Sequence, residues 1–223
     1  MKRTPLSERR LPRYTRGEER FHMISHIVGG GFGVAVLICC IAISLSHRRP
    51  CSMVSSVIYG GSLIALYTMS SLYHGLPAGT GKKVLQILDH CTIYLLIAGT
   101  YTPVVLVAIR PAYPVWGWTL FALVWGLAAV GATFTAIDLK KYSVLSMICY
   151  LGMGWCIVIA LRPTLASVPL PALLWILAGG IAYTVGAVLY GLGKRHRFVH
   201  GVFHIFVLIA SVFQFIGIAD YIL

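Results

Sequence analysis

The stretch VLQILDHCTIYLLIAGTYTPVVLVAI, residues 84–109, decides the fold of this chain. It is long enough to cross a bilayer as a helix, because a spanning helix needs about 20 predominantly apolar residues. Yet it carries a carboxylate, Asp89, and an imidazole, His90, close to its start. A charged group inside a membrane costs at least about 2.5 kcal/mol, so it marks a functional site by default. The stretch therefore predicts a membrane helix with a site near one end.

The rest of the chain repeats this apolar pattern. Of its 223 residues 58% are hydrophobic and 11% charged, and the mean hydropathy is +0.85. Such a chain is too apolar for a soluble domain. Six further stretches are long enough to span: 24–46, 52–74, 114–135, 142–161, 168–191 and 198–223. We expect an all-α, polytopic membrane protein, a bundle of seven transmembrane helices in one domain over residues 24–223, preceded by a basic segment, residues 1–23.

The net charge of +12 indicates topology rather than nucleic-acid binding. The basic residues lie between the apolar stretches and not on one accessible face. The N-terminal segment and alternate loops, at 82–83, 140–141 and 194–197, hold fourteen of the 18 Lys and Arg residues. By the positive-inside rule the N-terminus is cytoplasmic and the C-terminus lies outside. We expect a multi-pass protein of the plasma membrane, the inner membrane of a bacterium, with membrane lipids as its partners.

Two local patterns refine this picture. Thr15 and Glu18 form a capping box, which predicts a short helix from Thr15 along the cytoplasmic leaflet, where its arginines would attract anionic lipids; a solvated, disordered tail is the alternative. Gly29 and Gly33 form a small-xxx-small face, which predicts a close contact with another helix.

Four ionisable side chains lie near same-side ends of three apolar stretches. His200 and His204 are four residues apart, so their rings share one helix face. At about 1.5 Å of rise per residue, Asp89 and His204 lie at similar depths, and His74 ends the preceding stretch on the same side. Three histidines with water in a fourth position form the open geometry of a catalytic zinc site. We therefore predict His74, His200 and His204 as ligands of Zn²⁺.

Asp89 and Ser70 complete the predicted catalytic set. Asp89 would orient or deprotonate the water. Ser70 lies one turn before His74, where its hydroxyl could assist an oxyanion, or else bond back to its own helix. His90 points about 100° away from Asp89 and is interpreted as a supporting or packing residue.

Three residues at the entry to the first apolar stretch are harder to assign. Glu19 and His26 share one face of that helix and could lock it against the site. His22 could equally cap the helix at the membrane interface.

Five blocks of the chain resemble the haemolysin III family, the bacterial branch of the progestin and adipoQ receptor superfamily. They are GEERFHMISHIVG (17–29), SSLYHGLP (70–77), LDHCTIYLLIAGTYTP (88–103), YLGMGW (150–155) and HRFVHGVFH (196–204). The resemblance implies a seven-helix bundle that holds zinc near the cytoplasmic leaflet through His74, His200 and His204, with Asp89 and Ser70 at the family's water-holding and neighbouring positions. One departure is visible, because many bacterial relatives resemble GEExxNxxSH in the first block and His22 stands at the Asn position.

These observations support three hypotheses on function. The first is a zinc-dependent hydrolase of lipids, acting on a ceramide-like amide, as the resemblance implies. The second is a non-catalytic sensor or regulator of membrane lipids whose zinc is structural. The third is a cytolysin, which the seven permanent spans disfavour, because a secreted pore former should lack them. A transporter is disfavoured by the scarcity of ionisable residues in the fourth, fifth and sixth spans.

Overall fold

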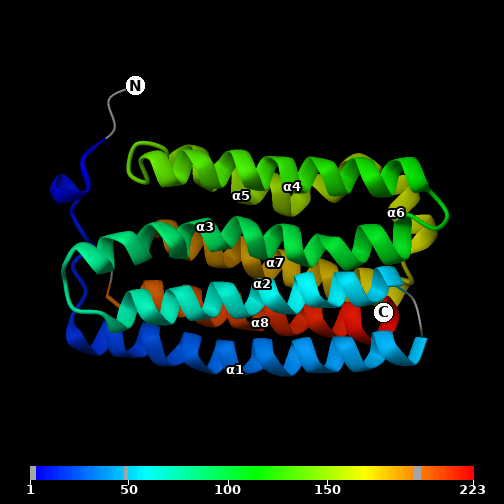
Figure 1. Cartoon of the computed structure of the whole chain (residues 1–223), viewed down its shortest axis with the longest axis horizontal. Coiled ribbons are helices and arrows are strands. Elements are labelled where there is room, and N and C mark those ends of the chain that lie inside the picture. The colour runs from blue at the N-terminus through cyan, green and yellow to red at the C-terminus, as the bar shows by residue number, and fades with distance from the viewer. Residues whose placement is uncertain (1–3, 48–49, 193–196) are drawn as a thin grey trace.

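The protein is a bundle of long, roughly parallel helices (Figure 1). The computed structural model describes residues 4–47, 50–192 and 197–223. In chain order the helices are η1 (Leu6–Glu8), α1 (Arg16–His47), α2 (Pro50–Gly75), α3 (Thr80–Pro103), the π-helical η2 (Val104–Ile109), α4 (Pro114–Ile137), α5 (Ser143–Trp155), the 3-10 helix η3 (Cys156–Ala160), α6 (Leu161–Ser167), α7 (Leu170–Leu192) and α8 (Val199–Tyr221).

Seven helical stretches within the described residues are long and apolar enough to cross a membrane. The helix α3 continues through η2 as one stretch, and α5, η3 and α6 together make the fifth. This confirms the all-α class and the seven predicted spans, and the chain is a multi-pass membrane protein. Which side of the membrane each end faces stays a prediction.

The first helix begins earlier than the hydropathy indicated. It starts at Arg16 rather than at Ile24, because the capping box at its start is formed. The Thr15 amide donates to Glu18 Oε2 at 2.8 Å, and the Glu18 amide donates back to Thr15 Oγ1 at 3.3 Å. The short helix expected from Thr15 is therefore the first part of α1, and it is continuous with the first span.

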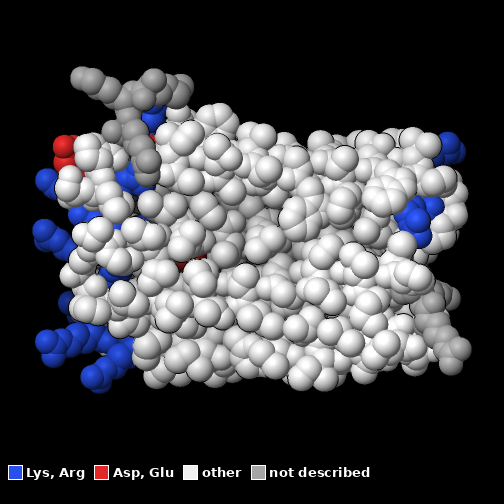
Figure 2. Space-filling model, in the orientation of Figure 1, with Lys and Arg blue, Asp and Glu red and all other residues white. Residues whose placement is uncertain are grey.

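Charge is concentrated at one end of the bundle. Figure 2 shows the visible lysines and arginines gathered mainly at the end where α1 begins, with a long uncharged surface beyond it. We call this the N-terminal end and the opposite one the far end. The basic residues Lys2, Arg3, Arg48, Arg49, Lys194 and Arg195, which the topology prediction counted, lie outside the described residues.

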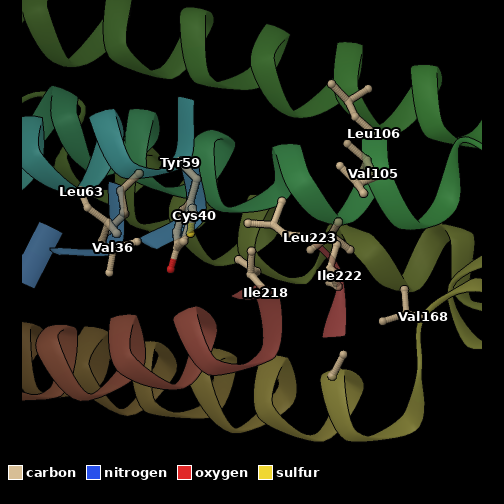
Figure 3. Packing of buried hydrophobic residues seen from close by; sticks show 14 of the residues in the cluster. Val36, Cys40, Tyr59, Leu63, Val105, Leu106, Val168, Ile218, Ile222 and Leu223 are labelled. Carbon is tan, nitrogen blue, oxygen red and sulfur yellow. The ribbon is translucent and has the colours of Figure 1, made fainter. Parts of the chain in front are cut away.

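Glycines allow α1 and α2 to pack closely. A Cβ at Gly29 would overlap the Tyr67 ring, and one at Gly33 would press on Ile64. The predicted small-residue contact is confirmed. The main apolar core lies toward the far end, where Val36, Tyr59 and Ile218 meet the end of α3 and its π-helical turn (Figure 3). Because this core lies toward the far end, the N-terminal end has room for polar side chains.

Candidate metal centre

Five histidines from three helices meet at the N-terminal end. They are His22 and His26 of α1, His74 of α2, and His200 and His204 of α8. The ring centroids of His22, His74, His200 and His204 lie 4.7–5.6 Å apart in every pairing. The three predicted ligands are thus brought together from opposite ends of the sequence, and two histidines of α1 join them.

Local sequence positions each ring. The spacing of His200 and His204 places both on one face of α8, and their Nε2 atoms are 3.2 Å apart. That separation is close to the roughly 3.3 Å expected between two nitrogens that bind one tetrahedral zinc ion. His22 and His26 have the same spacing on α1. The His26 ring stacks on His204 with centroids 3.8 Å apart and planes inclined by 21°.

A carboxylate orients His74. Glu19 Oε2 lies 2.7 Å from His74 Nδ1, and Glu19 Oε1 lies 2.8 Å from the ammonium of Lys82. Lys82 also donates to the Leu76 carbonyl at 2.9 Å, which ties the end of α2 to the start of α3. A carboxylate on one imidazole nitrogen fixes the ring and leaves the other nitrogen for a metal, as is usual for histidine ligands.

Several imidazole nitrogens in this cluster have no hydrogen-bond partner in the part of the chain that the structure describes. Both nitrogens of His22 and of His26, Nε2 of His74 and Nδ1 of His204 are buried without a hydrogen bond to the described residues. Buried polar atoms are nearly always satisfied, so each exception needs an explanation such as an ion. His22, His74 and His200 each offer a nitrogen within 4.8 Å of the other two, so the donor set fits a metal ion.

The structure and the sequence prediction differ in the ligand set they favour. The compact triad contains His22, whereas the sequence favoured His204 beside His74 and His200. His204 lies against the triad. The assignment of His74, His200 and His204 stays a prediction, and the structure shows that His22 belongs to the same cluster.

The predicted catalytic residues line a cavity beside the histidines. This cavity has a volume of about 160 Å³, and its walls come from α2, α3, α5, α7 and α8, with His26 contributed by α1. Asp89, Ser70, His200 and His204 all contribute to its lining, and apolar side chains dominate the remainder. His90 also lines it and is held by Tyr190 Oη, 3.2 Å from its Nε2, in keeping with a supporting role. The catalytic roles of Asp89 and Ser70 stay predictions.

The N-terminal segment packs over the histidine cluster through Tyr14. The Tyr14 ring stacks on His200 with centroids 5.3 Å apart and meets His22 edge-on at 5.0 Å. Burial, reinforced by Tyr190 and by nearby carboxylates, raises the pKa of the Tyr14 hydroxyl well above its ordinary value of 10. Lys83 fastens the segment by donating to the carbonyls of Leu6 and Ser7 at 3.0 and 2.8 Å.

A second contact fixes the start of α8. Phe198 has a left-handed backbone, with φ of 60°, and its amide donates to Glu18 Oε1 at 3.0 Å. The capping carboxylate of α1 therefore also holds the residue that precedes α8. This contact sets His200 against α1.

Sequence reasoning missed the place of His22 in the cluster and the stacking of Tyr14 on it. A signal for His22 was present, because His22 and His26 repeat the four-residue spacing of His200 and His204. No comparable signal marks Tyr14, whose position depends on how the N-terminal segment folds back over the bundle. Glu19 was expected to lock α1 against the site, and its contact with His74 confirms that expectation.

Fold and site together define a multi-pass helical membrane protein with a buried histidine cluster between its first two spans and α8. The chain belongs to the haemolysin-III related family, whose model matches residues 14–215. This confirms the resemblance read from the five sequence blocks.

Named relatives cover most of the chain. It is 36% identical to Hemolysin-3 of Bacillus cereus over 206 residues, 92% of each chain. It is also 36% identical to the Hemolysin-3 homolog of Bacillus subtilis (strain 168) over 208 residues, 93% of this chain and 96% of that one. A more distant match is the monocyte to macrophage differentiation factor of Homo sapiens, 27% identical over 179 residues, 75% of this chain and 70% of that one.

Proposed function

We propose that this protein is a zinc-dependent hydrolase of a lipid amide, of the ceramide-like class, in the plasma membrane with its N-terminal end in the cytoplasm. The observation that carries the proposal is the buried histidine cluster, several of whose nitrogens have no hydrogen-bond partner among the described residues. Its members His26, His200 and His204 line one apolar cavity together with Asp89 and Ser70. Apolar walls suit a lipid chain, and a few convergent polar groups suit a reacting centre.

The proposed roles follow from the chemistry of the side chains. The histidine cluster would hold the ion, with His74, His200 and His204 as the predicted ligands. A zinc ion bound there would supply a Lewis acid and lower the pKa of water from 15.7 to about 7. Asp89 would accept a proton from the attacking water as general base. The Ser70 hydroxyl would donate to the oxygen that gains charge as the amide carbonyl is attacked.

The cavity suggests where the rest of the lipid lies. Between α5 and α7 it is bordered by Gly154 and Gly180, beside which a Cβ would meet open space. The Trp155 indole donates to Thr184 Oγ1 at 3.1 Å across the same pair of helices. A chain entering from the bilayer between these helices would place its polar end at Asp89 and Ser70.

The test measures metal and product together in purified protein reconstituted in vesicles. We expect the wild type to hold one zinc and to hydrolyse at least one of a panel of lipid amides, detected by mass spectrometry. Asp89→Asn should abolish hydrolysis while zinc is retained, and Ser70→Ala should lower the rate on the order of 100-fold. Undiminished turnover by Asp89→Asn would exclude this mechanism.

A sensor with structural zinc is the second candidate, because the nitrogens come from α1, α2 and α8 and an ion would clamp these helices. Chelation would then lower the melting temperature, and no lipid product would form in the wild type. If chelation changed neither quantity, the sensor would be excluded as well.

A cytolysin is the function that the names of the Bacillus relatives suggest. It requires that purified protein added to red cells lyse them while His204→Ala does not. Lysis only after overexpression would instead point to disturbed membrane lipids.

A further inference from the structure

His22 is the most completely buried member of the histidine cluster, with 0% of its surface exposed. Its ring lies 4.7 Å from that of His74, 4.8 Å from that of His200 and 5.1 Å from that of His204. It is therefore central among the three predicted ligands rather than peripheral to them. A residue that merely capped α1 at the membrane interface would be expected to reach solvent.

Neither nitrogen of His22 has a hydrogen-bond partner among the described residues. Two other histidines of the bundle do have hydrogen-bond partners. His74 Nδ1 meets Glu19, and His90 meets the Gln86 carbonyl at 2.8 Å and Tyr190. A buried imidazole with two unmet nitrogens loses the free energy of hydration without compensation. Ligation would satisfy one of these nitrogens directly.

Like His22, His26 has no hydrogen-bond partner for either nitrogen among the described residues, but its ring is placed differently. Its ring lies face to face with His204 at 3.8 Å and edge-on to Tyr67 at 5.1 Å. Stacking of this kind supports the ring of His204 from the side. Neither His26 nor His204 belongs to the compact nitrogen triad that contains His22. His204 Nε2, however, lies 3.2 Å from His200 Nε2, whereas neither nitrogen of His26 has a hydrogen-bond partner among the described residues.

We propose that His22 is a metal ligand, so that His22, His74, His200 and His204 together supply four nitrogens to one ion in the resting protein. Four ligands fill the coordination number that zinc takes in closed sites, whereas the sequence predicted three and an open position. The proposal rests on the metal site of the proposed function and not on its hydrolytic activity.

A metal ion held by four histidines has no free position for another molecule. A small anion or a substrate carbonyl can reach the ion only if one histidine gives way. His74 is held by Glu19, which is itself held by Lys82. His22 has no such restraint among the described residues, and its neighbour Tyr14 belongs to the N-terminal segment outside the spans. Release of His22 would therefore break no hydrogen bond to the described residues, unlike release of His74.

The test replaces the native ion with Co²⁺, whose visible absorption reports its ligands. The purified full-length wild type should bind one Co²⁺, with a spectrum that azide leaves unchanged. His22→Asn should bind Co²⁺ on the order of 10- to 100-fold more weakly, in the range seen when even indirect support of a ligand is lost. Its spectrum should change when azide is added. His47→Asn, the matched control at the far end of the bundle, should behave as the wild type.

A variant that adds a new absorption band tests directly whether residue 22 binds the ion. His22→Cys should place a thiolate on the ion and produce a sulfur-to-cobalt charge-transfer band in the near ultraviolet. His47→Cys, at the far end of the bundle, should produce none, and neither should the six native cysteines. A wild type that responds to azide as strongly as His22→Asn, or a His22→Cys variant that holds Co²⁺ without the band, would overturn the role of His22 and leave the metal site intact.

Two further outcomes keep the proposals separate. If the wild type binds no Co²⁺ or Zn²⁺, the metal site of the proposed function falls and His22 falls with it. If the variants at position 22 do not fold, the wild-type Co²⁺ form still decides. Four hyperfine-shifted imidazole N–H proton signals would support four histidine ligands, and three would overturn the proposal.

Discussion

Both ends of the bundle bury polar side chains, but they satisfy them differently. At the far end the Ser44 hydroxyl lies 2.8 Å from that of Ser56 and donates to that of Ser52 at 3.1 Å. Even a histidine is paired there, since His47 Nδ1 lies 2.7 Å from the Leu223 carbonyl oxygen. At the N-terminal end, by contrast, four of the clustered histidines leave nitrogens without a partner among the described residues.

The comparison distinguishes two roles that buried polar groups can have in a membrane protein. Hydroxyls that bond one another hold helices together and need nothing else. Nitrogens that converge without bonding indicate a ligand that the protein itself does not supply. The contrast is one of degree, because the hydroxyls of Ser55, Tyr59 and Ser167 also have no partner among the described residues. Zinc, however, is bound by imidazole nitrogens rather than by neutral hydroxyls.

The largest expected difference between the two ends is their response to chelation. An ion present at about 1,000 times its dissociation constant stabilises the folded state by about 4 kcal/mol. At roughly 2–4 °C per kcal/mol for a chain of this size, a chelator should lower the melting temperature of the wild type by roughly 10 °C. His200→Ala should melt at the same temperature with and without chelator. If chelation left the melting temperature of the wild type unchanged, the two ends of the bundle would not differ in this respect.

The support of His74 gives the next effect. Glu19→Gln removes the charge that orients His74 and pairs with Lys82. We expect metal affinity to fall on the order of 10- to 100-fold, measured by competition with a chromophoric chelator. Glu8→Gln, at an exposed carboxylate of η1, is the matched control and should bind as the wild type. Equal affinities in the two variants would mean that Glu19 does not act through the metal.

The serine cluster should give a smaller and purely structural effect. Ser44→Ala removes the hydroxyl that joins Ser52 and Ser56, and hydrogen bonds of this kind are worth about 0.6 kcal/mol in membrane helices, up to about 1.7. Unfolding by a denaturing detergent measures that loss. Ser46→Ala, at an exposed serine bonded only within its own helix turn, should cost less. Any loss of bound metal in Ser44→Ala would contradict the separation of the two ends.

The smallest effect concerns the cover over the histidines. Hydrogen bonds from Thr4, above all, and from the Lys141 amide lower the pKa of Asp138 from 3.8 to about 2. A lowered pKa means that the carboxylate stabilises the folded state above pH 3.8 and loses this effect as the pH falls toward 2. Pepsin should therefore cleave the N-terminal segment faster as the pH drops through this range.

Asp138→Asn serves as the control for that pH dependence. Without a titrating carboxylate, its cleavage rate should show no additional rise between pH 4 and pH 2. If the variant and the wild type respond to pH alike, Asp138 does not fasten the segment.

The fold was largely predictable because a membrane imposes simple rules on composition. Long apolar stretches must be helices, and all seven were predicted, five of them with both ends within four residues. The fifth helical stretch continues to Ser167, six residues beyond its predicted end. The start of α1 was placed too late, since hydropathy does not register a polar helical turn that extends out of the membrane. The capping box at Thr15 marked that start more accurately than the apolar pattern did.

The site was predictable only where spacing within one helix carried the information. His200 and His204 share a face of α8 by their spacing alone, and depth brought His74 near them. The position of His22 required knowledge of how α1 rotates against α2. That rotation depends on tertiary contacts such as Gly29 against Tyr67, which no pattern along one helix specifies. The position of Tyr14 depends on how the N-terminal segment crosses several helices, so no local sequence pattern could predict it.

The origin of the cluster in α1, α2 and α8 also bears on how the protein is made. Almost the whole chain separates His22 from His200, and membrane helices enter the bilayer one after another during synthesis. While α3 to α7 are being inserted, the histidines of α1 and α2 have no counterpart from α8. The ion-binding arrangement can arise only once α8 is in place, so capture of an ion would report that assembly of the bundle is complete.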